Sequence, residues 1–401
     1  RRPADPGPAV KRPAAPAAAR RRGPAIAVAV LAACAAGCGQ TASHQAVRPA
    51  AVLAPSLNTS LDTTAGTWAA VVMGRTGTSD NAFSQLFTRP AGSTSWKLVT
   101  PPGVATNGGF VLAAQGGRSL IAGFRPGVDL TFSALTATRD NGTNWEPGSP
   151  LQPGLADVPD ALAAAPGGQR MLALLLGGTL TQSTDQGAHW TALPGLRSLA
   201  GTAAGRRCSP AALTAVSLTP AGTPLAAATC TRPGIAGIFS YTAGRWQGAG
   251  PSLPASLAGT ATGVMRLTST PAGNEALLAV GTGTAASLLA TWTSGGDAHW
   301  TVSAPLRLGA AAVRSAGFGS AGTAWAVLTN GRAETIVSPA ETWHALPAVP
   351  PGTAALAPGP DGGFDALAVS GSELTVWRLS PGATGWTTTQ VISVPIEYGS
   401  S

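Results

Sequence analysis

Charged side chains are scarce in this sequence. Only 10% of its 401 residues are charged, and lysine occurs twice, at Lys11 and Lys97. Hydrophobic residues make up 44%, which excludes an intrinsically disordered chain and allows a large core in one or two domains. No segment after residue 40 has the 3.6-residue period of an amphipathic helix. The sequence therefore predicts an all-β protein.

The sequence also lacks a basic stripe that could follow a nucleic-acid backbone. The net charge is +8, but the first 22 residues carry seven basic side chains against Asp5 alone. Residues 23–401 hold 18 basic and 16 acidic side chains, which nearly cancel. Because phosphate binding needs clustered cations, we expect no nucleic-acid partner.

No hydrophobic run is long enough to predict a resident membrane helix. The most apolar segment, GPAIAVAVLAACAAGCGQ from Gly23, follows three arginines and has an apolar core of ten to thirteen residues, typical of a secretory signal. Its end, Leu31-Ala32-Ala33-Cys34, resembles a bacterial lipobox, which implies a lipid on Cys34. Cys38 is an alternative site, and an ordinary cleaved signal or an uncleaved anchor are alternative interpretations.

These features predict three segments. Residues 1–38 are a signal and lipoprotein leader, residues 39–60 a flexible tether, and residues 61–397 the folded domain. The protein is then exported and displayed on the outer face of the cytoplasmic membrane or the cell surface, with the membrane as the partner of its lipid anchor.

Cysteine is rare outside the leader. Cys208 and Cys230 flank a segment that reads as strand, Pro-Gly turn and strand. The start of the first strand of an antiparallel hairpin lies near the end of the second, so the two thiols are placed to meet. We predict a disulfide, with a buried thiol pair as the alternative.

An apolar segment recurs seven times, each time after a Gly-containing turn. The turns end at intervals of 51, 51, 54, 51, 49 and 41 residues, at Gly66, Gly117, Gly168, Gly222, Gly273, Gly322 and Gly363. A tryptophan follows each segment, at Trp96, Trp145, Trp190, Trp246, Trp300, Trp343 and Trp386. The recurrence indicates a repeat architecture.

Each repeat reads as four short strands, of which the apolar one is the second. A strand begins at or just after each tryptophan, and a more polar, alternating strand precedes it. Seven such units predict an all-β fold, a seven-bladed β-propeller of four-stranded blades. A pair of β-sandwiches is the alternative, although sandwiches do not need a sevenfold repeat.

Two repeats share the pattern S/T-x-D-x-G-x-x-W. It occurs as TRDNGTNW, with Thr138, Asp140, Gly142 and Trp145, and as STDQGAHW, with Ser183, Asp185, Gly187 and Trp190. The pattern resembles the Asp box, or BNR repeat, of the sialidase-like propellers. The resemblance covers about residues 60–395 and implies that these turns join the third and fourth strands, away from the central ligand site. Asp140 and Asp185 are therefore interpreted as turn-stabilising residues.

The catalytic set of sialidases is not recognisable in this chain. That family uses an arginine cluster, a Tyr nucleophile paired with Glu, and an Asp acid/base. Here Phe124-Arg125-Pro126 is the nearest match to its F-R-I-P motif, and Tyr241 and Tyr398 have no Glu partner by position. No metal or cofactor motif appears either, so we expect neither.

Two functions remain as hypotheses. The first is a non-catalytic binding or scaffolding protein, expected to be a monomer, whose unknown protein or glycan ligand binds loops on one face. Candidate loop residues are Arg125, Asp129, Arg206, Arg207 and Asp361. The alternative is a sialidase-like glycoside hydrolase with Arg125 and Asp129 in its site. Two arginines and a carboxylate converging in the central channel would favour the enzyme.

Overall fold

The computed structural model describes ten stretches of the chain. They are residues 59–74, 82–102, 109–124, 135–148, 159–175, 177–294, 299–319, 322–337, 341–359 and 361–395. All of them belong to one structural unit, which runs from Ala46 to Ser401. No helix among these residues is long and apolar enough to cross a membrane.

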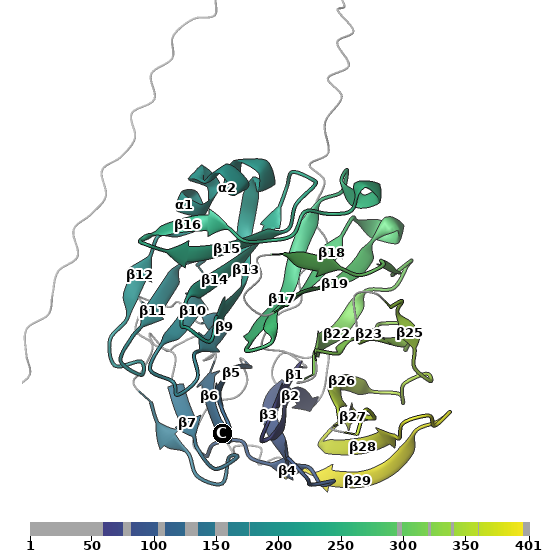
Figure 1. The fold of residues 1–401 in the computed structure, drawn as a ribbon. Helices are drawn as coiled ribbons and strands as arrows, with labels where there is room; N and C mark the ends of the chain where they lie inside the picture. The colour runs from purple at the N-terminus through teal and green to yellow at the C-terminus, as the bar shows by residue number, and fades with distance from the viewer. Residues whose placement is uncertain are drawn as a thin grey trace, which may run out of the picture. The chain divides into compact units, whose positions relative to one another are not determined.

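Seven four-stranded antiparallel units follow one another along the chain (Figure 1). Blade 1 contains β1 (Thr59–Thr63), β2 (Gly66–Gly74), β3 (Ala82–Pro90) and β4 (Lys97–Leu98). Blade 2 contains β5 (Phe110–Gly116), β6 (Ser119–Phe124), β7 (Leu135–Thr138) and β8 (Glu146–Pro147). Blade 3 contains β9 (Pro159–Ala164), β10 (Met171–Leu175), β11 (Leu180–Ser183) and β12 (Thr191–Leu193).

The remaining four blades repeat this order. Blade 4 contains β13 (Pro210–Leu218), β14 (Pro224–Cys230), β15 (Gly237–Thr242) and β16 (Arg245–Gly248). Blade 5 contains β17 (Thr262–Thr270), β18 (Gly273–Val280), β19 (Ser287–Thr293) and β20 (Trp300–Val302), with β21 (Leu306–Arg307) also paired to β19. Blade 6 contains β22 (Val313–Phe318), β23 (Ala324–Leu328), β24 (Ala333–Ile336) and β25 (His344–Ala345). Blade 7 contains β26 (Thr353–Pro358), β27 (Phe364–Ser370), β28 (Glu373–Leu379) and β29 (Thr387–Ser393).

The first strands of the blades are neighbours around a ring. β1 contacts β5, and the series continues through β9, β13, β17 and β22 to β26, which contacts β1 again. Blades 4 and 5 are further joined by one ladder pair, Cys230 with Thr262. The predicted seven-bladed β-propeller is therefore confirmed.

The core is divided into seven apolar clusters, one at each seam between adjacent blades. The second strands supply most of these side chains because both of their faces are buried. In β2, for example, Ala69, Val71 and Met73 face blade 7, whereas Trp68 and Ala70 face blade 2. This alternation explains why the recurrent segments are apolar throughout.

Glycine is required where the first strand turns into the second. Gly66 and Gly273 have φ values of 139° and 146°. A Cβ atom would lie 2.4 Å from the carbonyl oxygen of Arg89 at the first position and 2.0 Å from that of Thr293 at the second. The third strand thus approaches the turn too closely for any side chain.

Two short helices correct the expectation that no helix follows residue 40. α1 (Leu196–Gly201) and α2 (Ala203–Cys208) lie between blades 3 and 4, and the 3₁₀ turns η2 (Ala255–Leu257) and η3 (Gly283–Ala285) lie before and within blade 5. At six residues each, α1 and α2 are too short to display a 3.6-residue period. The hydroxyl of Thr202 accepts a hydrogen bond from the Gly205 amide, 2.9 Å away, and caps α2.

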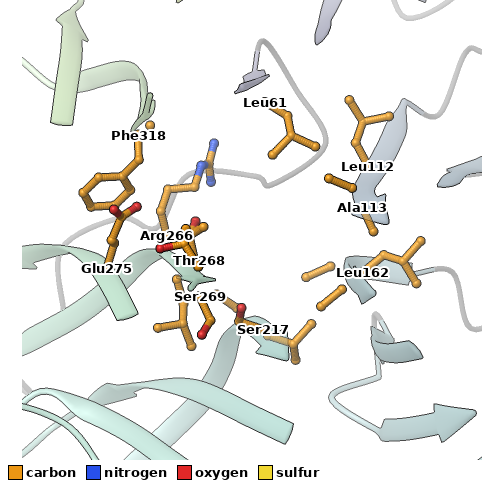
Figure 2. A pocket seen from close by; sticks show the side chains of 18 of the residues that line it. Leu61, Leu112, Ala113, Leu162, Ser217, Arg266, Thr268, Ser269, Glu275 and Phe318 are labelled. Carbon is orange, nitrogen blue, oxygen red and sulfur yellow. The ribbon is translucent and has the colours of Figure 1, made fainter. Parts of the chain in front are cut away.

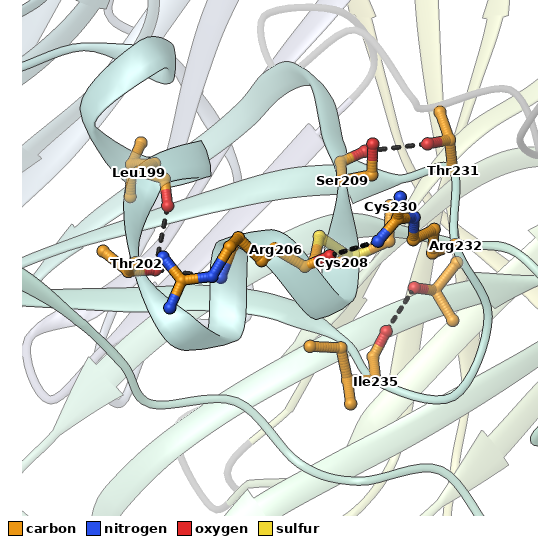
Figure 3. Close-up of a disulfide and its surroundings, with 11 residues drawn as sticks. Leu199, Thr202, Arg206, Cys208, Ser209, Cys230, Thr231, Arg232 and Ile235 are labelled. Atoms are coloured by element: carbon orange, nitrogen blue, oxygen red, sulfur yellow. Dashed lines mark hydrogen bonds between the residues drawn. A yellow bond between two sulfur atoms is a disulfide. The ribbon is translucent and has the colours of Figure 1, made fainter.

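A disulfide joins the end of α2 to the end of β14. Cys208 and Cys230 are bonded, their Cα atoms are 4.7 Å apart, and both residues are fully buried (Figure 3). Pro210 pairs with Cys230 in the ladder between β13 and β14, which brings the start of one strand to the end of the other.

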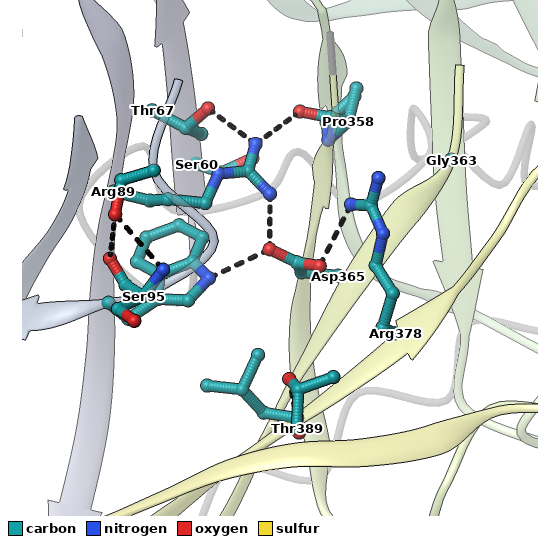
Figure 4. Close-up of polar contacts among 12 residues, drawn as sticks. Ser60, Thr67, Arg89, Ser95, Pro358, Gly363, Asp365, Arg378 and Thr389 are labelled. Atoms are coloured by element: carbon teal, nitrogen blue, oxygen red, sulfur yellow. Dashed lines mark hydrogen bonds and ion pairs between the residues drawn. The ribbon is translucent and has the colours of Figure 1, made fainter. Parts of the chain in front are cut away.

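The ring closes between blades 7 and 1 without an exchanged strand among the described residues, because each of these blades consists of four consecutive strands. One backbone hydrogen bond, from the Gly74 amide to the Gly371 carbonyl at 2.8 Å, crosses the seam, and several side chains cross it as well (Figure 4). The carboxylate of Asp365 pairs with Arg89 and Arg378 and accepts a hydrogen bond from Trp96 Nε1 at 2.8 Å. The side-chain amide of Gln390 bonds both the N–H and the carbonyl of Trp96, at 2.8 and 2.9 Å.

Candidate functional site

The turns around Asp140 and Asp185 have closely similar hydrogen bonds, which hold each loop closed. They join β7 to β8 and β11 to β12. In the first turn the hydroxyl of Thr138 donates to Asp140 Oδ1 at 2.9 Å and accepts from the Gly142 amide at 2.9 Å. Asp140 Oδ1 also accepts from the Asn144 amide at 2.8 Å. These bonds lower the pKa of Asp140, so its carboxylate is fully used within the turn.

The second turn repeats this arrangement around Asp185. Ser183 Oγ donates to Asp185 Oδ1 at 2.8 Å and accepts from the Gly187 amide at 2.8 Å. His189 contributes its amide and, at 2.6 Å, its ring Nδ1 to the Asp185 carboxylate. The hydrogen bonds from His189 lower the pKa of Asp185 to about 2. Both turns lie on the outer strands, so neither carboxylate is placed near the ring centre.

The recurrent tryptophans join each blade to the one before it. In five repeats the indole Nε1 donates to a backbone carbonyl of the preceding blade or the loop after it, at 2.5–3.1 Å. The donor and acceptor pairs are Trp145 with Val99, Trp246 with Pro194, Trp300 with Ala249, Trp343 with Ala304, and Trp386 with Pro347. Trp96 donates to Asp365 instead, and Trp190 Nε1 has no acceptor among the described residues. These tryptophans are thus part of the framework of the ring of blades.

The first strands of six blades line a cavity of about 240 Å³, here called the channel cavity (Figure 2). Its walls are largely Ala, Val and Leu from β1, β5, β9, β13 and β17, completed by the end of β22. The polar lining residues include Ser217 on β13 and Thr268 and Ser269 on β17. The cavity is therefore largely apolar, with a few hydroxyl groups and the ionisable side chains of Asp62, Arg266 and Glu275 in its lining. Apolar walls with a small number of polar groups are found in ligand-binding sites.

Arg266 on β17 extends into the channel cavity (Figure 2). Its Nη1 donates to the carbonyl of the adjacent Met265 at 3.1 Å, and its buried Nη2 has no hydrogen-bond partner among the described residues. Burial lowers the pKa of Arg266 to about 10, which still leaves the guanidinium charged at neutral pH. The cavity thus holds a cation whose hydrogen-bonding capacity is incompletely used.

Glu275 on β18 adds a carboxyl group to the wall between blades 5 and 6. It is 6% exposed, and a Cβ on Gly322 of blade 6 would lie 3.1 Å from its Oε1. Burial raises the pKa of Glu275 to about 7, and no ion pair joins it to Arg266 among the described residues. No group of three or more His, Cys, Asp or Glu side chains in the described part could hold a metal ion.

The structure does not gather the predicted loop residues at the channel. Arg206 and Arg207 lie exposed on α2 rather than in a loop, and the side chain of Asp361 bonds Arg378 beside the closing seam. The next residues, Gly362 and Gly363, line a second cavity of about 650 Å³ between blades 6 and 7. Arg125, Asp129, Cys34 and Cys38 lie outside the described residues.

Sequence reasoning missed Arg266, which lies within β17, and Glu275, which lies near the start of β18. A signal was present for Arg266: it interrupts the first strand of its repeat, in GVMRLTST. The first strands surround the ring centre, so the side chain of a charged residue in one of them faces either the channel or a seam between blades. Glu275 gave no comparable signal, since it stands at the polar start of its strand.

Comparisons with known proteins show the fold and nothing finer. No family model matches the chain, and no curated protein does. Among solved structures, a protein from Lactobacillus plantarum is 12% identical with a TM-score of 0.53, over 82% of this chain and 97% of the other. A putative 6-phosphogluconolactonase from Bacteroides fragilis is 13% identical with a TM-score of 0.52, over 82% and 96%.

A third similar structure is the GH74 xyloglucanase from Xanthomonas campestris. It is 16% identical with a TM-score of 0.50, over 82% of this chain and 53% of the other. The chain is a β-propeller. At these identities the similarity extends to the fold alone, because one propeller architecture serves binding proteins and enzymes alike.

Proposed function

We propose that this β-propeller is a non-catalytic binding protein that takes an anionic group of its ligand into the channel cavity. The observation that supports the proposal is Arg266, a half-buried cation whose buried Nη2 has no hydrogen-bond partner among the described residues, in a cavity lined by six blades. A guanidinium nitrogen that is removed from water without an acceptor is destabilising for the free protein. A ligand carboxylate or phosphate would supply the missing acceptor.

The arrangement of the channel supports binding over glycoside hydrolysis. Among the described lining residues, Arg266 is the single arginine, whereas the sialidase-like alternative calls for at least two with a carboxylate. Tyr241 lies in β15 and packs on Trp246, with ring centroids 5.0 Å apart. Tyr241 is therefore not placed as a channel nucleophile, and Tyr398 lies outside the described residues.

We further propose that the chain is a divergent Asp-box propeller, exported and anchored by a lipid on Cys34 or, alternatively, Cys38. The two turns around Asp140 and Asp185 support the kinship through their shared hydrogen bonds. Export agrees with the disulfide between Cys208 and Cys230, because such bonds persist in oxidising compartments. The protein then acts as a binding or scaffolding module at the cell surface.

The test compares partners captured by the full chain from its own cell envelope. Arg266→Gln removes the channel cation, and Ala114→Trp fills the cavity from a half-buried position on β5. Arg118→Gln and Ala188→Trp are matched controls, since both residues are exposed on turns at other places. We expect one partner to be lost with both channel variants and kept with both controls. A partner profile unchanged in both channel variants would contradict binding in the channel.

Turnover assays complete the test. The purified full chain is incubated with fluorogenic sialosides and with fluorogenic β-glucosides, and release of the fluorophore is followed. We expect no release above a heat-denatured sample. Release that is lost with Arg266→Gln and kept with Arg118→Gln would overturn the non-catalytic assignment.

A further inference from the structure

The outer part of blade 4 carries arginines without any neighbouring acid in sequence. From residue 186 to residue 274 the chain contains six arginines and no Asp or Glu. Arg266 is the one in the channel. The other five are exposed and are here called the arginine sector: Arg197, Arg206, Arg207, Arg232 and Arg245.

The α1–α2 insert holds much of this sector on one rigid support. α2 packs against the outermost strand β16, where a Cβ on Gly248 would come within 2.3 Å of the Ala204 Cβ. Leu199 of α1 is fully buried in the cluster between blades 3 and 4. Figure 1 shows both helices at the rim of blade 4, beside β16. The insert is thus part of the folded ring.

The disulfide brings the two arms of the sector together. Cys208 ends α2 and Cys230 ends β14, so the segment after β14 is tied to the insert (Figure 3). Arg232 Nη1 donates to the carbonyl of Arg206 at 2.9 Å, which places these two residues side by side. Thr231 Oγ1 donates to the Ser209 carbonyl at 2.9 Å and reinforces the same junction.

No counter-charge compensates the sector within the described part of the chain. None of its five arginines forms an ion pair there, and Arg197, Arg207 and Arg245 form no side-chain hydrogen bond there either. Several other described arginines do have acidic partners, such as Asp365, Glu334 or Glu146. Clustered like charges without partners destabilise the folded state, so their presence on a rigid support points to an external anion.

We propose that the arginine sector docks blade 4 on an anionic phospholipid surface. Guanidinium groups bind lipid phosphates with paired hydrogen bonds, and a set of separate exposed cations suits a broad anionic surface. A lipid anchor combined with basic residues gives far firmer attachment than either alone. The inference uses the anchoring part of the proposed function for its location and is independent of the channel ligand.

The test measures binding of the full chain to vesicles of phosphatidylcholine that contain about 30% phosphatidylglycerol, the anionic lipid. Vesicles of pure phosphatidylcholine are the reference. A Cys34→Ala, Cys38→Ala background prevents lipid modification. The sector variant is Arg197→Gln, Arg207→Gln, Arg245→Gln, and these side chains make no hydrogen bond within the described residues that the change could break. The control variant is Arg118→Gln, Arg139→Gln, Arg307→Gln, three exposed arginines on other blades with the same change in net charge. All variants keep the basic N-terminal residues, so their contribution cancels.

Each arginine at an anionic membrane surface contributes about fivefold to the affinity. The sector variant lacks three of them, so it should bind anionic vesicles on the order of 100-fold more weakly. The control variant should stay within about threefold, and salt at about 0.5 M should abolish the difference. Hydrogen exchange should slow in residues 196–208 when vesicles are added. Equal losses in the two variants, or unchanged exchange in residues 196–208, would overturn the proposal.

Two further outcomes are informative. Protection of residues 196–208 by soluble polyglutamate but not by anionic vesicles would assign the sector to an acidic protein and overturn the membrane assignment. Loss of vesicle binding in the sector variant, with the partner of Arg266 still captured, would support membrane docking by the arginine sector. It would also show that this docking is separate from ligand binding in the channel cavity.

Discussion

Two ionisable residues, the buried Glu275 and the half-buried Arg266, distinguish the centre of this propeller from an ordinary apolar core. Arg266 and Glu275 both line the channel cavity, and neither forms an ion pair among the described residues. Burial favours the neutral form of each side chain. It lowers the pKa of Arg266 to about 10 and raises the pKa of Glu275 to about 7. Unpaired buried groups of this kind cost stability and are concentrated at functional sites.

Glu275 makes stability depend on pH in a defined window. Its pKa is about 7 in the folded protein and 4.5 when unperturbed, so the unfolded chain loses the proton first as pH rises. The free energy of unfolding should therefore fall between about pH 4.5 and pH 7 and then level off. Glu275→Gln should match the wild type near pH 4 and be more stable at pH 8, by up to about 3 kcal/mol.

Urea unfolding of both proteins across this pH range would measure the effect. Glu373→Gln is a suitable control because Glu373 is exposed at the start of β28. The difference in the free energy of unfolding between the wild type and Glu275→Gln should change from about pH 4 to about pH 8. A constant difference would show that Glu275 does not titrate as a buried acid.

At the scale of elements, the recurrent tryptophan is a connection between blades as well as part of the core. In five of the seven repeats it fixes the start of the fourth strand to the preceding blade or to the loop after that blade. In the repeat of Trp145, the turn held by Asp140 and the indole N–H act together. The hydrogen-bonded turn orients the ring, and the N–H fixes its far end to the Val99 carbonyl.

The hydrogen bond can be separated from the packing of the ring. Trp246→Phe removes the bond to the Pro194 carbonyl, whereas Trp190→Phe removes a similar ring with no acceptor among the described residues. We expect Trp246→Phe to lower the free energy of unfolding by about 1 kcal/mol more than Trp190→Phe, as one hydrogen bond contributes. Chemical denaturation measures this difference, and equal losses would mean that the bond adds no net stability.

Over the whole molecule, the seam between blades 7 and 1 differs in chemistry from the other six. Charged side chains cross this seam, whereas its described strands, like those at most of the other seams, form no ladder across it. The Asp365 carboxylate takes the place of a backbone carbonyl as the acceptor for Trp96, and it also neutralises the buried Arg89. Arg89 lies 5.3 Å from the centroid of the Trp96 ring, which adds a cation–π contact to the seam.

Ring closure should therefore depend strongly on Asp365. Asp365→Asn keeps the size of the side chain but leaves Arg89, which is 4% exposed, without its counter-charge. We expect the free energy of unfolding to fall by about 3–5 kcal/mol. Asp361→Asn is the matched control, since the exposed Asp361 bonds the same Arg378, and its effect should stay below about 1 kcal/mol. Similar losses in the two variants, measured by chemical denaturation, would contradict a closing role for Asp365.

The anchoring proposal also belongs to the whole molecule. If Cys34 carries the lipid, the protein should partition into the membrane fraction, and globomycin should cause its unprocessed precursor to accumulate. Cys34→Ala should abolish the globomycin-sensitive shift, while Cys38→Ala should leave it intact; the reverse result would move the lipid to Cys38. Absence of any shift in the wild type would refute the lipoprotein assignment.

The sequence alone determined the architecture, because the residue pattern that each blade requires occurs seven times in the chain. Local geometry requires the turn glycines, the apolar second strands and the recurrent tryptophans. Their recurrence was enough to predict the blades. The pairing of Cys208 with Cys230 followed in the same way from a single hairpin. α1 and α2 escaped prediction because six residues are too few to establish a period.

The tertiary structure alone decided which side chains meet across the ring. Asp365 and Arg89 are 276 residues apart, and Arg266 acquires its significance only when the first strands of six blades surround it. Such relations depend on closure of the ring, which brings distant repeats together and excludes water from between them. A carboxylate or guanidinium in one strand looks the same in sequence whether it faces a partner, an empty cavity or solvent.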